Sequence, residues 1–382
     1  MLHNKVKLLF PCLIILLAIV LNIIARFSVS FCDFYVVKIF PLIVNTYGRF
    51  FGIFPFSVGE FMLYAAVLLV IALFIGGFAC LFRVKFGFNK GEDRFVNFYS
   101  CYVKFCFWVT AVISLIMTTN VLILFHCSPI YEFYGNGALA NDSEREYGVY
   151  ELGKLRAYVV ENANLLAEEL PRDENGYLVY EGDMIKQTRI EMLRLGQEFD
   201  RLAGYYPRAK ALAFSNFFSR QGMMGYFFPF SMEANYNNSM YIVNFPTTIC
   251  HELAHLKGFI YEDEANFIGY LACAYSDEAF FRYSAYLAVL DYLDRDFMLA
   301  AGSDVYFANP QVSDKVARDN IFLTAEAWEA VEKNALFSTD FVWDISSEIL
   351  EVNLTLNGVS DGTMSYGRVV GLLLRYYDGI LY

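Results

Sequence analysis

The sequence predicts a protein of two parts: a membrane region of three transmembrane helices at residues 1–127, and an α-rich α+β domain at residues 128–382. Composition is the first observation behind this prediction. Apolar residues make up 57% of the chain, aromatic residues 18%, and mean hydropathy is +0.38, which is typical of a protein partly embedded in lipid. Charge is the second, because residues 1–127 carry a net charge of +6 and the remainder a net charge of −18.

Three stretches are long and apolar enough to cross a bilayer, which needs about 20 residues. They are residues 8–25, 61–82 and 105–127, and none of them contains Asp, Glu, Lys or Arg. A cleaved signal peptide is the alternative for the first stretch, because it has a basic start. Residues 31–58 are apolar but interrupted by charges and prolines, so we predict an interfacial or re-entrant segment there, with a fourth span as the less favoured alternative.

Basic residues predict the orientation of these spans. Lys5 and Lys7 precede the first span, and five Lys or Arg residues lie in and beside the loop that joins the second span to the third. The positive-inside rule places both segments in the cytoplasm, so three spans leave residues 128–382 on the outer face of the cytoplasmic membrane. The lipid bilayer is thus an expected partner. Nucleic acid is not, because an acidic domain repels a polyanion.

The outer domain is predicted to be mainly helical. Eight cysteines are scattered along the chain without a CxxC pair, which indicates neither a disulfide framework nor a zinc ribbon. The apolar spacing predicts helices, and β-branched and aromatic residues predict a strand that could pair with an extended substrate or belong to the core. The predicted elements are helices at 143–169 and 184–202, a turn at 173–176, a strand at 239–245, a helix opening at Pro246 with Thr248 as N-cap, and a helix at about 262–275.

The motif that carries chemistry is HExxH at His251-Glu252-Leu253-Ala254-His255. On a helix, histidines four residues apart share one face and can bind one metal ion, and the intervening glutamate can take a proton from water. The chain has four histidines, so a chance match to this pattern has a probability of roughly 0.3%. We therefore predict a Zn²⁺ site with His251 and His255 as ligands and Glu252 as the catalytic base.

The third zinc ligand is predicted from the residues that follow. Metzincins continue as HExxHxxGxxH, and this chain matches through Gly258 but has Tyr261 in place of the last histidine, which disfavours that class. Gluzincins take a glutamate from the following helix. Glu262 fits that role, with Asn266 one turn later to orient a ligand histidine. Glu264 is the alternative ligand, because the turn after the motif is short enough to present either carboxylate.

Three runs surround the motif, at residues 225–237 (GYFFPFSMEANYN), 244–273 (NFPTTICHELAHLKGFIYEDEANFIGYLAC) and 281–286 (FRYSAY). With these runs the chain resembles an uncharacterised family of bacterial multi-span membrane proteins, catalogued as a domain of unknown function with an HExxH zincin-like core of the gluzincin type. The PFSVGE run at residues 55–60 also fits, so the resemblance covers nearly the whole chain. It implies a zincin-like metallopeptidase fold for the outer domain but no substrate.

An oxyanion donor is also expected in a zinc hydrolase. Tyr283 is preferred because it lies in the FRYSAY run, and Arg282 and Tyr241 are the other candidates.

The sequence therefore predicts a membrane-anchored zinc-dependent hydrolase, a metallopeptidase by analogy, acting on a peptide or protein. An amidase that acts on cell-wall peptides would use the same chemistry. The alternative is a membrane-anchored binding or sensor protein with a structural or inactive zinc site. Glu252 favours the enzyme, because a structural site needs no base beside its metal. A transporter is disfavoured, because the three predicted spans contain no charged residue.

Overall fold

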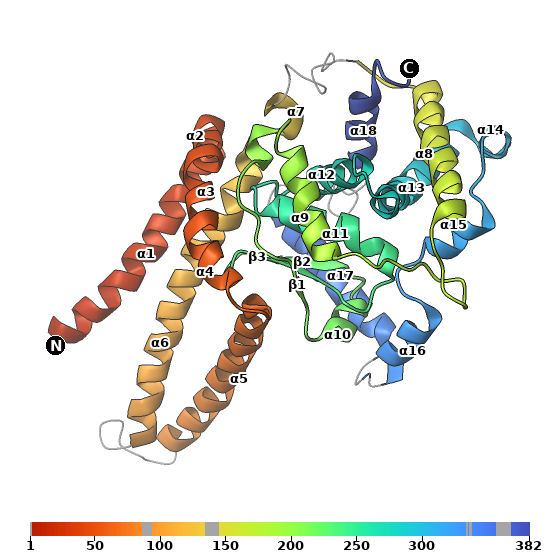
Figure 1. The fold of residues 1–382 in the computed structure, drawn as a ribbon. Helices are drawn as coiled ribbons and strands as arrows, with labels where there is room; N and C mark the ends of the chain where they lie inside the picture. Colours follow the sequence, from red (N-terminus) through yellow and green to blue (C-terminus); the bar gives the residue numbers. More distant parts are fainter. Residues whose placement is uncertain (1, 86–93, 134–144, 334, 336–337, 357–367) are drawn as a thin grey trace.

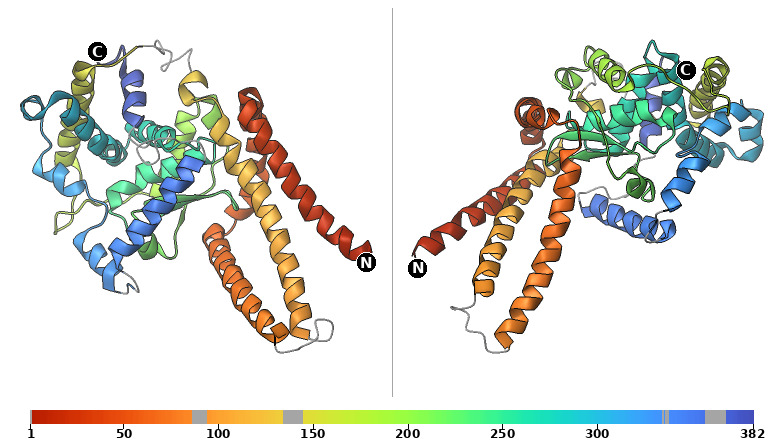
Figure 2. Two further views of the ribbon diagram at one scale, coloured as in Figure 1. Left: turned by 180° about the vertical axis from the view of Figure 1, so that it is seen from behind. Right: turned by 60° about the horizontal axis from the view of Figure 1, so that its bottom comes forward.

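The structure, a computed structural model, describes residues 2–85, 94–133, 145–333, 335, 338–356 and 368–382 (Figure 1). It is rich in helices, as the sequence predicts, and it contains a small three-stranded sheet. Long apolar helices project from one side of a compact helical domain (Figures 1 and 2).

The projecting helices are α1 (Leu2–Phe27), α5 (Val58–Lys85) and α6 (Arg94–Met117), which continues as helical turns to His126. Each contains a stretch long and apolar enough to cross a membrane. The start of α1, the end of α5 and the start of α6 all lie at the end remote from the compact domain (Figures 1 and 2). The helix ends that carry the basic sequence therefore gather on one side, and the acidic domain lies on the other.

Residues 29–52 form an almost continuous helix built from α2 (Val29–Phe34), α3 (Phe40–Ile43) and α4 (Arg49–Gly52) with wider helical turns between them. This stretch is also long and apolar enough to cross a membrane, and it covers most of the predicted interfacial segment. One side of it is buried in the same core as the compact domain, through Cys32, Tyr35, Val36, Phe40 and Val44. The Lys210 ammonium also donates to the Phe51 carbonyl at 2.8 Å, so the segment is attached to the domain along its length.

The domain is built around α11 (Phe245–His255), which packs against α9 (Met184–Leu195), α12 (Glu262–Ala274), α13 (Ala279–Ala301) and the sheet. A long helix, α8 (Val149–Glu169), packs along α13. The remaining helices of the described chain are α7 (Ile130–Phe133), α10 (Ser215–Ser219), α14 (Ser303–Ala308), α15 (Asp314–Asp319), α16 (Ala325–Lys333), α17 (Thr339–Leu356) and α18 (Val369–Tyr377). The second predicted helix is shorter than expected, because α9 ends at Leu195 rather than Leu202.

The sheet has the order β1-β3-β2. β1 (Lys210–Ala211) runs parallel to β3 (Glu233–Tyr236), and β2 (Gly225–Phe228) runs antiparallel to β3 with Gly225 opposite Tyr236. In the part of the chain that the structure describes, β2 pairs along one edge alone, so it is an edge strand.

The strand predicted at residues 239–245 is wrong. Residues 242–244 form a single 3₁₀ turn, and α11 begins directly after it with Pro246 in its first turn. Asn244 rather than Thr248 precedes this helix. Tyr241 and Val243 are buried in the core. Their burial, and not strand pairing of the backbone, accounts for the aromatic and β-branched composition of this segment.

A buried polar cluster joins the start of α5 to the sheet. Glu233 forms an ion pair with Lys210 and accepts a hydrogen bond from the Gly59 amide at 2.7 Å. Glu60 accepts one from the Ala213 amide at 2.7 Å. A Cβ atom on Gly59 would lie 2.4 Å from the Phe228 side chain, so glycine is needed for this close approach. The first turn of α5 is therefore docked directly on the β2–β3 hairpin.

Candidate metal centre

Two neighbouring helices bring the motif residues together. His251 and His255 lie one turn apart on α11, with ring centroids 4.7 Å apart. Gly258 then takes a positive φ of 82° and reverses the chain, so that α12 starts at Glu262. The helices pack closely where they cross, because a Cβ atom on Gly269 would lie 2.9 Å from the Thr247 carbonyl oxygen.

The side chains of His251, His255 and Glu262 converge, and their ligand atoms all lie within 4.8 Å of one another. Glu262 Oε2 lies 3.0 Å from His251 Nε2 and 4.0 Å from His255 Nε2. Ligand atoms of a tetrahedral zinc site lie ~3.3 Å apart, given bonds of about 2.0–2.1 Å. This group therefore fits a metal ion with small side-chain adjustments.

The other nitrogen of each imidazole is held by the protein. His251 Nδ1 lies 2.8 Å from the Asn266 side-chain oxygen, and His255 Nδ1 lies 2.7 Å from the Phe259 carbonyl oxygen. An oxygen acceptor at Nδ1 fixes the proton there and leaves the lone pair on Nε2, the atom that faces Glu262. In its neutral form each histidine is thus presented in the tautomer that binds metal.

Glu252 lies between the two histidines, and its side chain is buried. Its Oε2 atom has no hydrogen-bond partner among the described residues. Burial, followed by the negative charge of Glu262, raises the pKa of Glu252 to about 8, against the opposing effect of His251. A carboxyl with a pKa near neutrality is well suited to exchanging a proton during catalysis.

The two histidines differ in their proton affinity. Burial acts to lower the pKa of His251, but the hydrogen bond and charge of Glu262 outweigh it and raise that pKa to about 8. Burial lowers the pKa of His255 to about 4. At neutral pH His255 is ready to bind a cation, whereas His251 must first lose a proton.

A family model matches residues 35–374, which include the metal-binding group, the sheet, α5 and α6. The chain belongs to the DUF3810 family. The family is described as a protein of unknown function, which agrees with the predicted resemblance to a domain of unknown function. Neither the curated proteins nor the solved structures that we searched gave a match. Membership of DUF3810 thus supplies no activity, and any function must be argued from the site itself.

Two predicted residues of this DUF3810 chain are placed away from the metal-binding group. Glu264 is buried, and its carboxylate accepts a hydrogen bond from the Ile130 amide at 2.7 Å. In the group that could hold a metal ion, the carboxylate is that of Glu262. Tyr283 is fully buried and donates to Asp319 at 2.7 Å, and Asp319 in turn pairs with Arg172. The Tyr283 hydroxyl is therefore committed to a partner in the core.

The other oxyanion candidates are also engaged elsewhere. Tyr241 accepts a hydrogen bond from the Leu178 amide at 2.8 Å, and Arg282 donates to the carbonyls of Ser276 and Asp277 beside the start of α13. These contacts hold the fold together.

Sequence reasoning missed three residues that the structure brings to the site. Gly225 lies against Glu252, because a Cβ atom there would be 2.4 Å from Glu252 Oε1. Burial and the charges of Glu252 and Glu262 raise the pKa of Tyr226, and burial and the charge of Glu262 raise that of Tyr292. Gly225 and Tyr226 lie in one of the DUF3810-like runs, so a strand glycine before an aromatic residue was an available signal. Nothing in the sequence singled out Tyr292.

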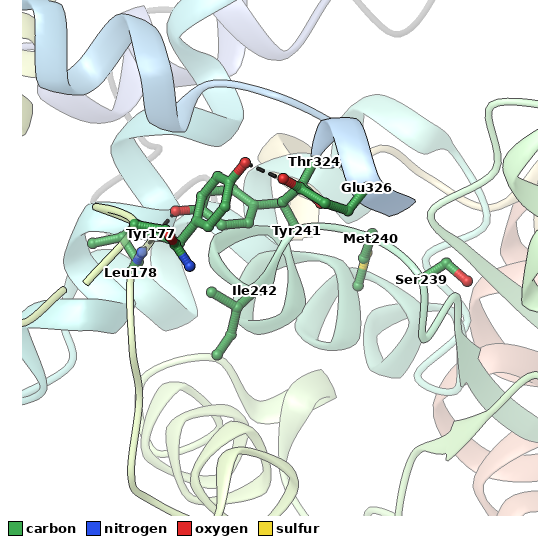
Figure 3. Close-up of a pocket in the computed structure, with 9 residues that line it drawn as sticks. Tyr177, Leu178, Ser239, Met240, Tyr241, Ile242, Thr324 and Glu326 are labelled. Carbon is green, nitrogen blue, oxygen red and sulfur yellow. Dashed lines mark hydrogen bonds between the residues drawn. The ribbon is translucent and has the colours of Figure 1, made fainter. Parts of the chain in front are cut away.

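A surface cavity of about 450 Å³ is formed in part by residues 239–242, which precede α11 in the sequence (Figure 3). It is lined by Asn175, Tyr177, Leu178, Ser239, Met240, Tyr241, Ile242, Thr324 and Glu326. The Tyr177 hydroxyl donates to Glu326 across it at 3.1 Å. None of the three metal-binding side chains lines this cavity, so it is distinct from the metal centre.

Proposed function

We propose that this protein is a zinc-dependent hydrolase, specifically a metallopeptidase, anchored in the bacterial cytoplasmic membrane with its site on the outer face. One observation carries the proposal. Three convergent ligand atoms lie beside a fourth ionisable group, the buried carboxyl of Glu252, which takes no part in holding them. A base beside an open metal site is the arrangement that metal-assisted hydrolysis requires.

The donor set fits zinc, because imidazole nitrogen and carboxylate oxygen are ligands that zinc accepts readily. Zinc held by His251, His255 and Glu262 would polarise the substrate carbonyl and lower the pKa of a nearby water. Asn266 and the Phe259 carbonyl keep the two imidazoles oriented. Glu252 takes the proton of the attacking water and returns it to the leaving nitrogen.

The edge strand supports a peptide substrate. β2 pairs with β3 on one side, and its first residue, Gly225, lies against Glu252. An extended peptide can add to the other edge of such a strand by backbone hydrogen bonds. The backbone of a peptide bound along this edge would pass directly beside Glu252. We thus assign this role to β2 in place of the segment 239–245, for which pairing with a substrate is one of the two predicted alternatives.

The proposed side of the membrane follows from charge. The basic ends of α1, α5 and α6 gather opposite the acidic domain, and basic flanks remain in the cytoplasm. The metal centre then faces the outside of the cell.

The alternative is a binding or sensor protein with a structural zinc site. Structural zinc sites close the coordination shell with four protein ligands, whereas the described residues supply three at this position. Burial of Glu252 also raises its pKa, which costs stability that a structural site has no reason to lose. Both observations favour the enzyme.

The test uses the full chain purified in detergent or nanodiscs. We expect one zinc ion per chain, hydrolysis of a random-peptide library, loss of both on chelation, and recovery of both when zinc is restored. Glu262→Gln should lower zinc content and activity together. Glu264→Gln is the matched control and should retain both. Absence of zinc from folded protein contradicts the metal assignment, and zinc without cleavage of the library favours the structural alternative.

A further inference from the structure

A band of exposed aromatic side chains lies where the domain meets α5. We call Phe56, Phe61, Phe214, Phe217 and Trp343 the aromatic rim, and each of them is between 46% and 56% exposed. Apolar surface of this kind marks a contact with lipid or with another protein when it is contiguous.

The aromatic rim is contiguous from the membrane helix to the domain. The rings of Phe56 and Phe61 lie 5.4 Å apart at the start of α5. One turn later the Tyr64 ring packs on Phe214 at 5.0 Å, and Phe217 follows one turn further along α10. Trp343 of α17 covers Gly222, because a Cβ atom at Gly222 would lie 2.2 Å from the indole ring. The members of the rim thus come from α5, α10 and α17 and the residues that flank them.

The length of α5 sets the depth of this surface. Arg83 marks the cytoplasmic end of the apolar stretch, and Tyr64 precedes it by a helix length of about 28 Å at 1.5 Å per residue. The hydrocarbon core of a bilayer is about 30 Å thick. With Arg83 at one boundary, Tyr64 and the Phe214 ring packed on it reach the other boundary, the level at which aromatic residues concentrate in membrane proteins.

Lipid is the occupant that fits the aromatic rim. It is continuous with α5, whose apolar window has no buried residue and therefore faces lipid. α10 and α17 lie at the end of the domain from which α5 leaves, and α8 lies at the opposite end (Figures 1 and 2).

The aromatic rim is linked to the metal centre through Phe218 and β2. Phe217 contacts Phe218 with ring centroids 6.0 Å apart, and Phe218 contacts Tyr226 of β2 at 6.4 Å. Tyr226 directly follows Gly225, the residue that touches Glu252. The edge strand of the site therefore starts at the surface that the membrane would cover.

We propose that the aromatic rim lies in the boundary between lipid headgroups and acyl chains, and that the site acts on polypeptides anchored in the same bilayer. Such a chain would emerge from the lipid beside α10 and reach β2 without crossing bulk water. The substrate class rests on the proposed hydrolase function, whereas the lipid contact of the rim does not.

The lipid contact is tested with single-tryptophan versions of the full chain in phosphatidylcholine nanodiscs, with and without brominated lipid. The chain has tryptophans at 108, 328 and 343. We expect native Trp343 alone, and Phe217→Trp alone, to be quenched about twofold or more by bromine, as a residue at the lipid boundary should be. Leu165→Trp on α8, where Leu165 is exposed, is the control and should not respond. If bromine quenches neither Trp343 nor the Phe217→Trp side chain, the proposal is overturned.

The substrate class is tested with one random-peptide library presented in two forms, coupled to phosphatidylethanolamine in the same bilayer or free in solution. We expect the coupled form to be cleaved about tenfold faster or more at equal total concentration, because anchoring raises the local concentration. Phe214→Ser with Phe217→Ser should lower this ratio, and Leu165→Ser should not. Equal cleavage of the two forms overturns the substrate class. Rim quenching without cleavage of either form overturns the hydrolase and leaves the lipid contact standing.

Discussion

Gly225 of the edge strand lies so close to Glu252 that a Cβ atom on it would be 2.4 Å from the carboxylate Oε1. The contact joins two features that are 27 residues apart in the sequence, the strand proposed to hold the substrate and the proposed base. Moving either one displaces the other.

Gly225→Ala should therefore reduce peptide hydrolysis by at least about tenfold, because a misplaced catalytic group loses most of its effect. Zinc content should stay at the wild-type level, since the three ligands are on α11 and α12. The measurement is the rate on the random-peptide library together with zinc content. Gly371→Ala is the control, because a Cβ atom there would meet nothing within 4 Å. Wild-type activity of Gly225→Ala would show that the contact has no catalytic role.

Asn266→Ala should weaken zinc binding by about 10- to 100-fold, the usual effect of removing a group that orients a metal ligand. The reason is the 2.8 Å contact between the Asn266 oxygen and His251 Nδ1. Zinc affinity measured by competition with a chelator gives the answer. Asn164→Ala serves as the control, because Asn164 on α8 donates to the Gln311 carbonyl at 2.9 Å and neither residue belongs to the metal-binding group. Equal zinc affinities for the two variants would show that Asn266 does not orient His251 for zinc binding.

Zinc binding at pH 7 should release about two protons, one from His251 and one from Glu252, because both have a pKa of about 8 without metal. His255, with its pKa of about 4, contributes none. Titration calorimetry in buffers of different ionisation enthalpy measures the number. Glu252→Gln should reduce it to about one. An unchanged count would mean that Glu252 is already ionised in the metal-free protein.

The contribution of Glu252 to the stability of the metal-free protein should fall as pH rises from about 4.5 to 8. Glu252 binds its proton more tightly in the folded state, where its pKa is raised from 4.5 to about 8, so the unfolded state gains from ionisation over that range. The cost at pH 7 is about 2–4 kcal/mol at 1.36 kcal/mol per pKa unit. Glu252→Gln should thus raise the Tm of the chelated protein by roughly 5 °C at pH 7 and hardly at all at pH 4.5. Equal shifts at both pH values would contradict the raised pKa.

The sequence predicted the features that depend on local spacing. His251 and His255 share a helix face because they are four residues apart, and Glu262 begins the next helix because Gly258 ends the first one. Apolar length alone indicated α1, α5 and α6.

Features set by packing between distant segments could not be predicted in this way. Residues 239–245 have the composition of a strand, but their aromatic and β-branched side chains serve burial in the core. Tyr283 was chosen from a recognised run, and only the fold shows its hydroxyl paired with Asp319. The approach of Gly225 to Glu252 likewise depends on how the sheet packs against α11.

The most direct test of the central claim compares the zinc-loaded full chain with Glu252→Gln on the same random-peptide library. We predict equal zinc content in both and a loss of hydrolysis of about 100-fold or more in the variant, since general base catalysis contributes about 10²- to 10⁴-fold. Wild-type hydrolysis by a zinc-loaded Glu252→Gln protein would contradict the role of Glu252 and with it the proposed mechanism.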